Sequence, residues 1–354
     1  MLASAPKSTL VFPDRIVTLL VVMLLFAISA TAQYTKTNLT GDVQGEGNFT
    51  DPHLKNGWGL AAVRSSIAGT FWVADEGTGL ATVYSSTGQP SSIVVTIPTA
   101  SGQGTGSPAG LVANTTSSFK ITKGAQTAPA QFLFSTLDGT ISGWNPTVDP
   151  THAVIAVNNS ASGALYTGLA IAFTNQGNFI YAADSAGNKV DIFDGNFNFV
   201  RSFTDTNLPP GFTPYGIQVF SSTLYVTYAI SFPKIPAAMG FVDTYDLAGG
   251  SQKRLIEDSS LNQPWGVAVA PPNFGPLANS LLVANLGDGL INAYNRSTGV
   301  FLGTLKQNGS PIVISGLWGI TFAPNSRTTT PSKLFFAAGP GGYIHGLFGV
   351  ITAN

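Results

Sequence analysis

The sequence feature that most constrains the fold is a short motif that occurs six times along the chain. Each copy has an aromatic or small residue, then glycine, then alternating apolar residues, and the six glycines are Gly59, Gly110, Gly168, Gly216, Gly266 and Gly319. Successive glycines lie 51, 58, 48, 50 and 53 residues apart. A period of about 50 residues is typical of an array of structural repeats.

Each motif is followed by further short apolar runs. The second run is seen at residues 71–75 and 180–184, the third follows a glycine-rich turn, as at residues 290–294, and the fourth is seen at residues 301–306. Four short strands in each unit indicate a blade of a β-propeller. The alternative is a β-solenoid, whose repeats are usually shorter and do not need four strands. The sequence therefore predicts an all-β fold, a six-bladed β-propeller with four-stranded blades.

The strand count also predicts how the ring closes. The sixth unit, which begins at Trp318, has three apolar runs before the chain ends, and a spare strand at residues 34–42 precedes the first motif. We expect this N-terminal strand to pair with the last blade, because closure leaves no open edge at the junction. The repeated glycines fit the same picture, since the first strands converge at a narrow centre where glycine permits close approach.

Composition supports many turns and argues against several classes of function. Charged residues are 9% of the chain, well below the roughly 25% of an average soluble domain, and there are 40 glycines and 22 prolines. The net charge is −1 and no basic block occurs, which argues against a nucleic-acid partner. The chain has no cysteine, so disulfides and thiolate chemistry are excluded.

The N-terminal segment has the pattern of a secretory signal peptide. Lys7 and Arg15 precede an apolar run at residues 16–30, and Ala30-Thr31-Ala32 forms a cleavage pattern before Gln33. The alternative is an uncleaved membrane anchor, but a run of 15 residues is short of the roughly 20 that a span needs. We therefore expect a signal peptide at residues 1–32 and one propeller domain at residues 33–354. The domain is then secreted, extracellular or periplasmic, with no membrane span after cleavage.

Several longer segments carry a family resemblance. They include Phe71-Trp72-Val73-Ala74-Asp75, Asp138-Gly139-Thr140-Ile141-Ser142-Gly143-Trp144 and Asn285-Leu286-Gly287-Asp288-Gly289. Their order resembles the NHL class of repeats. Residues 34–354 as a whole more closely resemble a family of uncharacterised secreted bacterial propeller proteins. This resemblance implies the fold and the location, and it implies no activity.

Acidic residues in the turns after the second strands are candidate metal ligands. The resemblance to NHL-like propellers implies that turn residues gather on one face near the central opening, namely Asp75, Glu76, Asp138, Asp184, Asn285 and Asp288. The first four, Asp75, Glu76, Asp138 and Asp184, are the candidate metal ligands. Carboxylates from several blades could hold Ca²⁺ or Mg²⁺, and related propellers include lactonases and gluconolactonases that use a central metal. The alternative is that each aspartate caps its own tight turn.

Aromatic residues at the starts of the first strands are candidate ligand-binding residues. They are Trp58, Tyr215, Trp265 and Trp318. Such rings at a cavity mouth can stack on sugar rings or apolar ligands. The alternative is that they pack between neighbouring blades as core, since large aromatic side chains dominate core packing.

No catalytic motif is convincing. The histidines are His53, His152 and His345, of which His53 could reach the start of a first strand and His345 is predicted to lie on a strand of the sixth blade. Neither Gly-x-Ser-x-Gly nor His-Glu-x-x-His occurs, and the loop at residues 102–106 lacks the strand-to-helix context of a phosphate-binding loop.

These features favour a binding or scaffold propeller without catalytic activity. It would hold an unknown small molecule, glycan or protein at one face. The alternative is a metal-dependent, lactonase-like hydrolase with its site at the central channel. The two differ in one observation: convergence of the four carboxylates on one point favours the hydrolase, and separate bonding to their own turns favours the binding module.

Overall fold

The computed structural model describes residue 1 and residues 34–63, 70–230, 239–323 and 332–354. Of the residues that the structure describes, 54% are in strands and 3% in helices, so this part of the protein is nearly all β-structure. The propeller lies within one compact unit, Ala32–Asn354. Apart from Met1, the predicted signal peptide lies outside the described residues. Within the described part, we find no helix with the length and apolar character that crossing a membrane requires.

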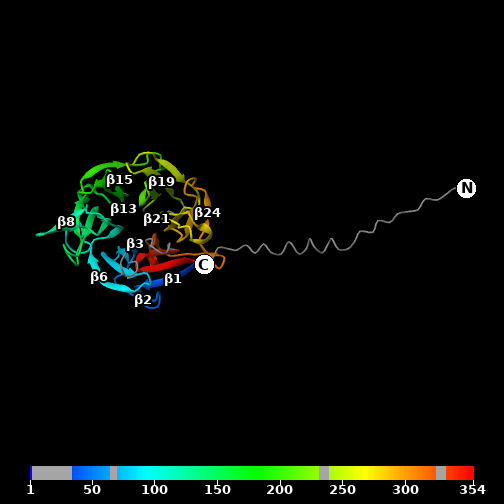
Figure 1. Cartoon of the computed structure of the whole chain (residues 1–354), viewed down its shortest axis with the longest axis horizontal. Helices are drawn as coiled ribbons and strands as arrows, with labels where there is room; N and C mark the ends of the chain where they lie inside the picture. Colours follow the sequence, from blue (N-terminus) through cyan, green and yellow to red (C-terminus); the bar gives the residue numbers. More distant parts are fainter. Residues whose placement is uncertain (2–33, 64–69, 231–238, 324–331) are drawn as a thin grey trace. The chain divides into compact units, whose positions relative to one another are not determined.

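The strands form six four-stranded antiparallel blades in chain order, which confirms the predicted fold (Figure 1). The first blade comprises β3 (Gly57–Val63), β4 (Thr70–Asp75), β5 (Leu80–Ser85) and β6 (Pro90–Thr96), and the second comprises β7 (Pro108–Ala113), β10 (Phe132–Thr136), β11 (Thr140–Trp144) and β12 (Val154–Asn158). The third comprises β13 (Tyr166–Thr174), β14 (Gly177–Asp184), β15 (Lys189–Asp194) and β16 (Phe199–Phe203), and the fourth comprises β17 (Thr213–Phe220), β18 (Thr223–Ala229), β19 (Phe241–Asp246) and β20 (Lys253–Ile256). The fifth comprises β21 (Pro264–Val269), β22 (Leu281–Asn285), β23 (Ile291–Tyr294) and β24 (Phe301–Thr304). In Figure 1, β3, β13 and β21 lie toward the centre and β6 and β24 lie at the rim.

The sixth blade joins the two ends of the propeller. It contains β27 (Leu317–Phe322), β28 (Lys333–Ala338), β29 (Leu347–Ala353) and the N-terminal strand β1 (Tyr34–Gly41), with β2 (Phe49–Thr50) at its outer edge. Strand β1 pairs antiparallel with β29 from Tyr34 opposite Ala353 to Gly41 opposite Leu347. The predicted closure by the N-terminal strand is therefore confirmed.

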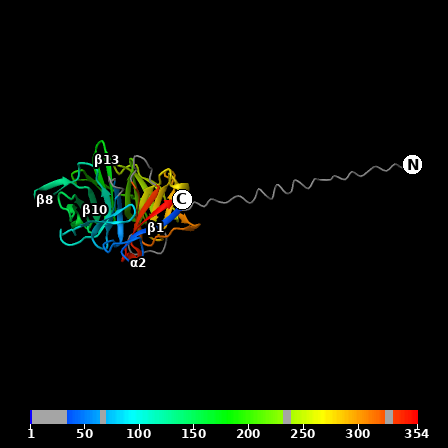
Figure 2. The ribbon, with the colours of Figure 1, turned by 60° about the horizontal axis from the view of Figure 1, so that its bottom comes forward.

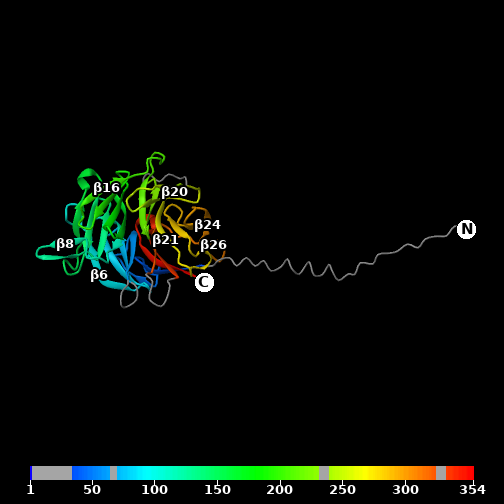
Figure 3. The same cartoon turned by 45° about the horizontal axis from the view of Figure 1, so that its top comes forward.

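Two small hairpins extend the ring. Strands β8 (Lys120–Lys123) and β9 (Gln126–Pro129) are inserted in the second blade, and Figure 2 shows β8 at the periphery. Strands β25 (Lys306–Gln307) and β26 (Ser310–Pro311) lie between the fifth and sixth blades in the chain. Figure 3 shows the outer strands β16, β20 and β24 following one another around the rim.

The apolar runs are nearly continuous because each blade is buried on both faces. In β10, Phe132 and Phe134 pack in the cluster shared with the first blade, whereas Leu133 packs in the cluster shared with the third blade. In β14, Ile180 faces the second blade and Tyr181 faces the fourth. Successive side chains of a strand point to opposite faces, so both sets must be apolar in a sheet covered on both sides. Most of the core therefore lies between neighbouring blades.

The repeated glycines bring the innermost strands together. A Cβ atom added to Gly59 would lie 2.6 Å from the carbonyl oxygen of Ala109 in the next blade. A Cβ atom added to Gly319 would lie 2.5 Å from the carbonyl oxygen of Trp58. The last blade therefore approaches the first as closely as the first approaches the second. Such distances are too short for non-bonded atoms. The predicted reason for these glycines, close approach at the centre, is confirmed.

Candidate functional site

The side chains predicted to be functional gather on one face of the ring. The first strand of each blade begins at this face, the antiparallel second strand ends there, and the chain returns there from each fourth strand. We call it the top face. Trp58 and Trp265 each occupy the second position of their first strand, and Asp75 and Asp184 each end their second strand.

The four predicted aromatic residues meet at the centre of the top face. The rings of Trp58 and Trp318 stack with centroids 3.6 Å apart. Tyr215 and Trp265 contact this pair edge to face, with centroids 5.9 to 6.3 Å from those of the two tryptophans. The four residues are only 2 to 9% exposed. We call Trp58, Tyr215, Trp265 and Trp318 the aromatic cluster, and it joins the first, fourth, fifth and sixth blades.

The polar atoms of the cluster have unequal partners. The Trp318 Nε1–H donates to Asn56 Oδ1 at 2.9 Å, and the Trp265 Nε1–H donates to the carbonyl oxygen of Thr167 at 3.1 Å. The buried Trp58 Nε1 has no hydrogen-bond partner among the described residues. Burial, with a smaller contribution from Tyr343, raises the pKa of Tyr215, so its hydroxyl stays protonated at neutral pH.

A cavity of about 270 Å³ opens beside the cluster, toward the second to fourth blades. Its lining residues are Trp58, Leu137, Leu165, Thr167, Ser185, Ala186, Gly211, Thr213 and Tyr215. No residue in this set carries a charge. The hydroxyls of Ser185 and Thr213 are 2.7 Å apart and hydrogen-bonded. We call this space the central cavity, and its chemistry suits an uncharged ligand with both apolar and hydroxyl surface.

Two of the predicted metal ligands, Asp75 and Glu76, bond within the first blade and its linker. Asp75 is fully buried, and its Oδ2 accepts a hydrogen bond from the Thr82 hydroxyl at 2.8 Å. Burial raises the pKa of Asp75 well above its usual range, and the nearby Asp51 carboxylate adds to this shift. The neighbouring Glu76 instead accepts from the side chain of Asn56 at 2.8 Å.

The other two predicted ligands, Asp138 and Asp184, bond to nearby backbone groups. Asp184 Oδ1 accepts from the N–H of Gly187 in its own turn and from that of Leu165, each at 3.0 Å. Asp138 accepts from the N–H of Ala100 at 2.6 Å and from the Thr136 hydroxyl. Across the described ranges, no group of three or more His, Cys, Asp or Glu side chains is placed to hold a metal ion. The metal site therefore stays a prediction.

Each histidine has a local polar neighbour. His53 Nδ1 lies 3.0 Å from Asp51 and His152 Nδ1 lies 2.9 Å from the Thr151 hydroxyl. The prediction that His345 lies on a strand is wrong: it lies between the short helix α2 (Pro340–Tyr343) and β29. Its Nδ1 is 3.1 Å from Asp42, which also accepts from Lys55, so His345 helps hold the junction where the ring closes.

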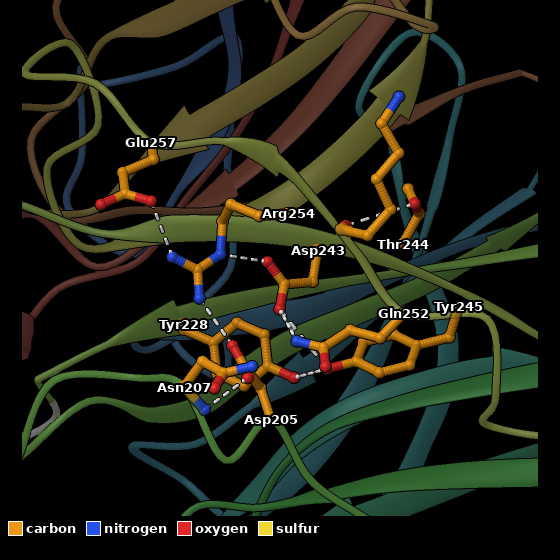
Figure 4. Close-up of polar contacts among 10 residues, drawn as sticks. Asp205, Asn207, Tyr228, Asp243, Thr244, Tyr245, Gln252, Arg254 and Glu257 are labelled. Carbon is orange, nitrogen blue, oxygen red and sulfur yellow. Dashed lines mark hydrogen bonds and ion pairs between the residues drawn. The ribbon is translucent and has the colours of Figure 1, made fainter.

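Sequence reasoning missed a buried ionic cluster between the third and fourth blades (Figure 4). Arg254 on β20 donates to Asp243 on β19 at 2.5 Å and to Asp205, in the linker from the third blade, at 2.6 Å. Its guanidinium also lies 4.3 Å from the centre of the Phe241 ring. Both aspartate side chains are fully buried. Asp205 and Arg254 are 49 residues apart, so no local sequence motif predicts that they meet. We call Asp205, Asp243 and Arg254 the Arg254 cluster.

The two aspartates of the Arg254 cluster have opposite pKa shifts. Burial raises the pKa of Asp243 to about 6, although hydrogen bonds from Gln252 and attraction to Arg254 oppose the shift. Burial also acts on Asp205, but hydrogen bonds from Gln252, Asn207 and Arg254 outweigh it and hold the pKa of Asp205 below its usual value. The cluster therefore keeps Asp205 ionised and makes Asp243 the group that takes up a proton first.

Comparison with known proteins gives relatives along most of the chain. No protein-family model matches. The chain is 33% identical over 320 residues to the uncharacterized protein R648 of Acanthamoeba polyphaga mimivirus, covering 86% of this chain and 76% of R648. It is 31% identical over 320 residues to protein L690 of the same virus, covering 86% and 82%. These relatives are viral, so they give no support to the predicted bacterial origin.

Solved structures with a similar fold are far more distant in sequence. A streptogramin B lyase superposes with a TM-score of 0.53 at 11% identity, covering 91% of this chain and 97% of the lyase. A gluconolactonase from Xanthomonas campestris superposes with a TM-score of 0.54 at 13% identity, covering 85% and 87%. At such identities the likeness shows the fold alone, because one fold supports many functions.

Proposed function

The chain belongs to the family of the mimivirus proteins R648 and L690, and from its geometry we propose that it is a binding propeller that holds an uncharged small molecule, such as the ring of a glycan, in the central cavity. The observation that carries this proposal is the lining of the cavity. Two aromatic side chains, Trp58 and Tyr215, lie beside threonine and serine hydroxyls, with no charged side chain among the lining residues.

This lining matches what a sugar ring offers. The ring has apolar C–H faces that pack on aromatic side chains and hydroxyls that exchange hydrogen bonds with polar groups. Small-molecule sites are typically concave and mostly apolar, with a few placed polar groups. The rigid ring of blades holds these side chains in place before the ligand arrives, which lowers the entropic cost of binding.

The test uses a substitution that fills the central cavity without altering the core. Ala186 lines the cavity from an exposed turn, so Ala186→Trp would occupy ligand space. Ala161→Trp places the same ring on the exposed 3-10 helix Ser160–Ser162, outside the cavity lining, and is the matched control. We expect isothermal titration with glucose, galactose, mannose and N-acetylglucosamine to detect binding of at least one sugar. Its affinity should fall at least about tenfold in A186W and stay unchanged in A161W.

Two outcomes would contradict the proposal. The first is absence of binding for all four sugars, together with absence of any hit on an array of uncharged glycans. The second is equal affinity for A186W and A161W, which would place the ligand elsewhere.

The alternative remains a lactonase-like hydrolase. Its support is the fully buried Asp75, because carboxyl groups with strongly raised pKa values concentrate at catalytic sites. Asp75 does not line the central cavity, so we prefer the binding module. Hydrolysis of gluconolactone above its spontaneous rate in the presence of Ca²⁺ or Mg²⁺, lost in Asp75→Asn, would favour the hydrolase.

We further propose that the propeller is exported after removal of residues 1–32. The support is the charged, apolar and small-residue pattern that ends at Ala32. Expression of the full chain in a secreting host should give a product that begins at Gln33. Ala32→Arg should block cleavage, and a product that retains Met1 in both cases would refute export by this route.

A further inference from the structure

A second cavity, of about 190 Å³, lies on the top face between the fifth and sixth blades. Its walls include five glycines, and the only ionisable side chains in its lining are Asp288 and Tyr343. No residue of this set also lines the central cavity. We call it the Asp288 cavity.

Asp288 is a half-buried carboxylate, and the described residues that donate to it are all neutral. Its Oδ1 accepts from the Leu290 N–H at 3.0 Å. Its Oδ2 is 3.4 Å from the Asn285 Nδ2, which is a long hydrogen bond. The Asn285 amide makes its shorter hydrogen bond, of 2.8 Å, to the Ser260 carbonyl oxygen. In the described part of the chain, no lysine, arginine or histidine forms an ion pair with Asp288.

The lack of a described basic side chain beside Asp288 affects the protonation of this carboxyl group. Burial raises the pKa of Asp288, and hydrogen bonds from Leu290, Asn285 and Asn262 offset the rise only in part. A buried negative charge without a counter-ion is unfavourable. A cation in the adjoining cavity would relieve that cost.

Tyr343 is the last residue of α2, whose backbone is a strained turn rather than a regular helix because three of its four residues have positive φ. Its φ of 75° is in the left-handed region, after Gly341 and Gly342 with φ values of 67° and 75°. A residue with a Cβ loses about 1–2 kcal/mol in this conformation, and such strain is concentrated at ligand-binding sites. The turn keeps the Tyr343 ring 5.8 Å from that of Trp318, at the wall of the cavity.

We propose that the Asp288 cavity binds a small organic cation of the alkylammonium class. Asp288 supplies the opposite charge, the Tyr343 ring supplies a cation–π contact, and the glycine walls let the alkyl groups approach the backbone closely. A divalent metal ion fits this site less well, because it requires several oxygen ligands and the lining offers one carboxylate.

The experiment is isothermal titration of the full chain with tetramethylammonium chloride and methylammonium chloride, each against an equal concentration of NaCl. Asp288→Asn should weaken binding at least about tenfold, as expected when a partly buried charge partner is lost. Asp258→Asn is the matched control, because Asp258 is an exposed acid in the linker before the fifth blade and does not line the cavity. Tyr343→Leu should weaken binding about 3- to 30-fold, and Tyr343→Phe, which keeps the ring, should restore it.

Each remaining outcome overturns the proposal. Absence of binding to both cations would refute the proposal. Equal binding by D288N and D258N, with unchanged thermal melts, would also refute it, because Asp288 would then make no contribution to binding. Binding of Ca²⁺ that depends on Asp288, without binding of alkylammonium, would replace the site with a metal site. Sugar binding reports independently on the central cavity, because A186W does not alter the Asp288 cavity.

Discussion

Two aspartates of neighbouring blades show how this chain treats a buried acid. Asp243 of the fourth blade is fully buried and contacts Arg254 at 2.5 Å and Gln252 at 2.9 Å. Asp288 of the fifth blade is half-buried and lines a cavity, and the described residues that donate to it are all neutral. At Asp243 the chain itself supplies the cation, Arg254, and the carboxylate has a structural role. Where no described residue supplies a cation, the cavity is open to a ligand.

The largest effect is expected when the cation of the Arg254 cluster is removed. Arg254→Met would leave Asp205 and Asp243 buried together without their shared partner. Breaking a buried ion pair by removing one partner costs about 3–5 kcal/mol. Urea denaturation should show that loss in the free energy of unfolding. Arg296→Met, which removes an exposed arginine, should change it by less than about 0.5 kcal/mol. Equal stability of the two variants would show that the cluster is not structural.

A smaller effect is expected when pH changes the charge of Asp243. Its pKa of about 6 in the folded protein is above the 3.8 of an exposed aspartate, so the folded state binds this proton more tightly than the unfolded state. The contribution of Asp243 to stability therefore increases as pH falls through 6 and is lost as pH rises above it. Arg254 keeps its charge over this range because its pKa is raised, and Asp205 titrates below it.

The matching measurement compares the wild-type protein with Asp243→Asn between pH 7.5 and 5. The wild type should gain about 1–2 kcal/mol of unfolding free energy relative to D243N as pH is lowered, after allowance for partial solvent screening. The histidines are common to both proteins and cancel in the difference. A difference that is flat or of opposite sign would mean that Arg254 keeps Asp243 ionised throughout.

The smallest effect is expected at Asp288. Asp288→Asn removes no ion pair in the described part and relieves the cost of a partly buried charge. The free energy of unfolding without ligand should therefore stay the same or rise by up to about 1 kcal/mol at pH 7. A clear loss of stability in urea denaturation would show that Asp288 has a structural role like that of Asp243.

The candidate site was predictable only in part. The positions of Trp58 and Trp318 at the starts of first strands predicted that they approach the centre, because the repeat places equivalent residues together. Their stacking at 3.6 Å and the cavity beside Trp58 were not predictable, since both depend on which blades carry large side chains at that position. Likewise, the Asp turns could be found in the sequence, but it could not be predicted that no basic side chain of the described residues pairs with Asp288.

The sequence by itself determined the number of blades, the glycines of the innermost strands and the use of a strand within residues 34–42 to close the ring. These features depend on periodicity and alternation, which are local and repeat along the chain. Only the tertiary structure decided that Asp243 meets Arg254 and that Asp288 faces a glycine-walled cavity. The environment of a charge depends on groups from other strands and linkers, and their distance in space cannot be read from their spacing in the chain.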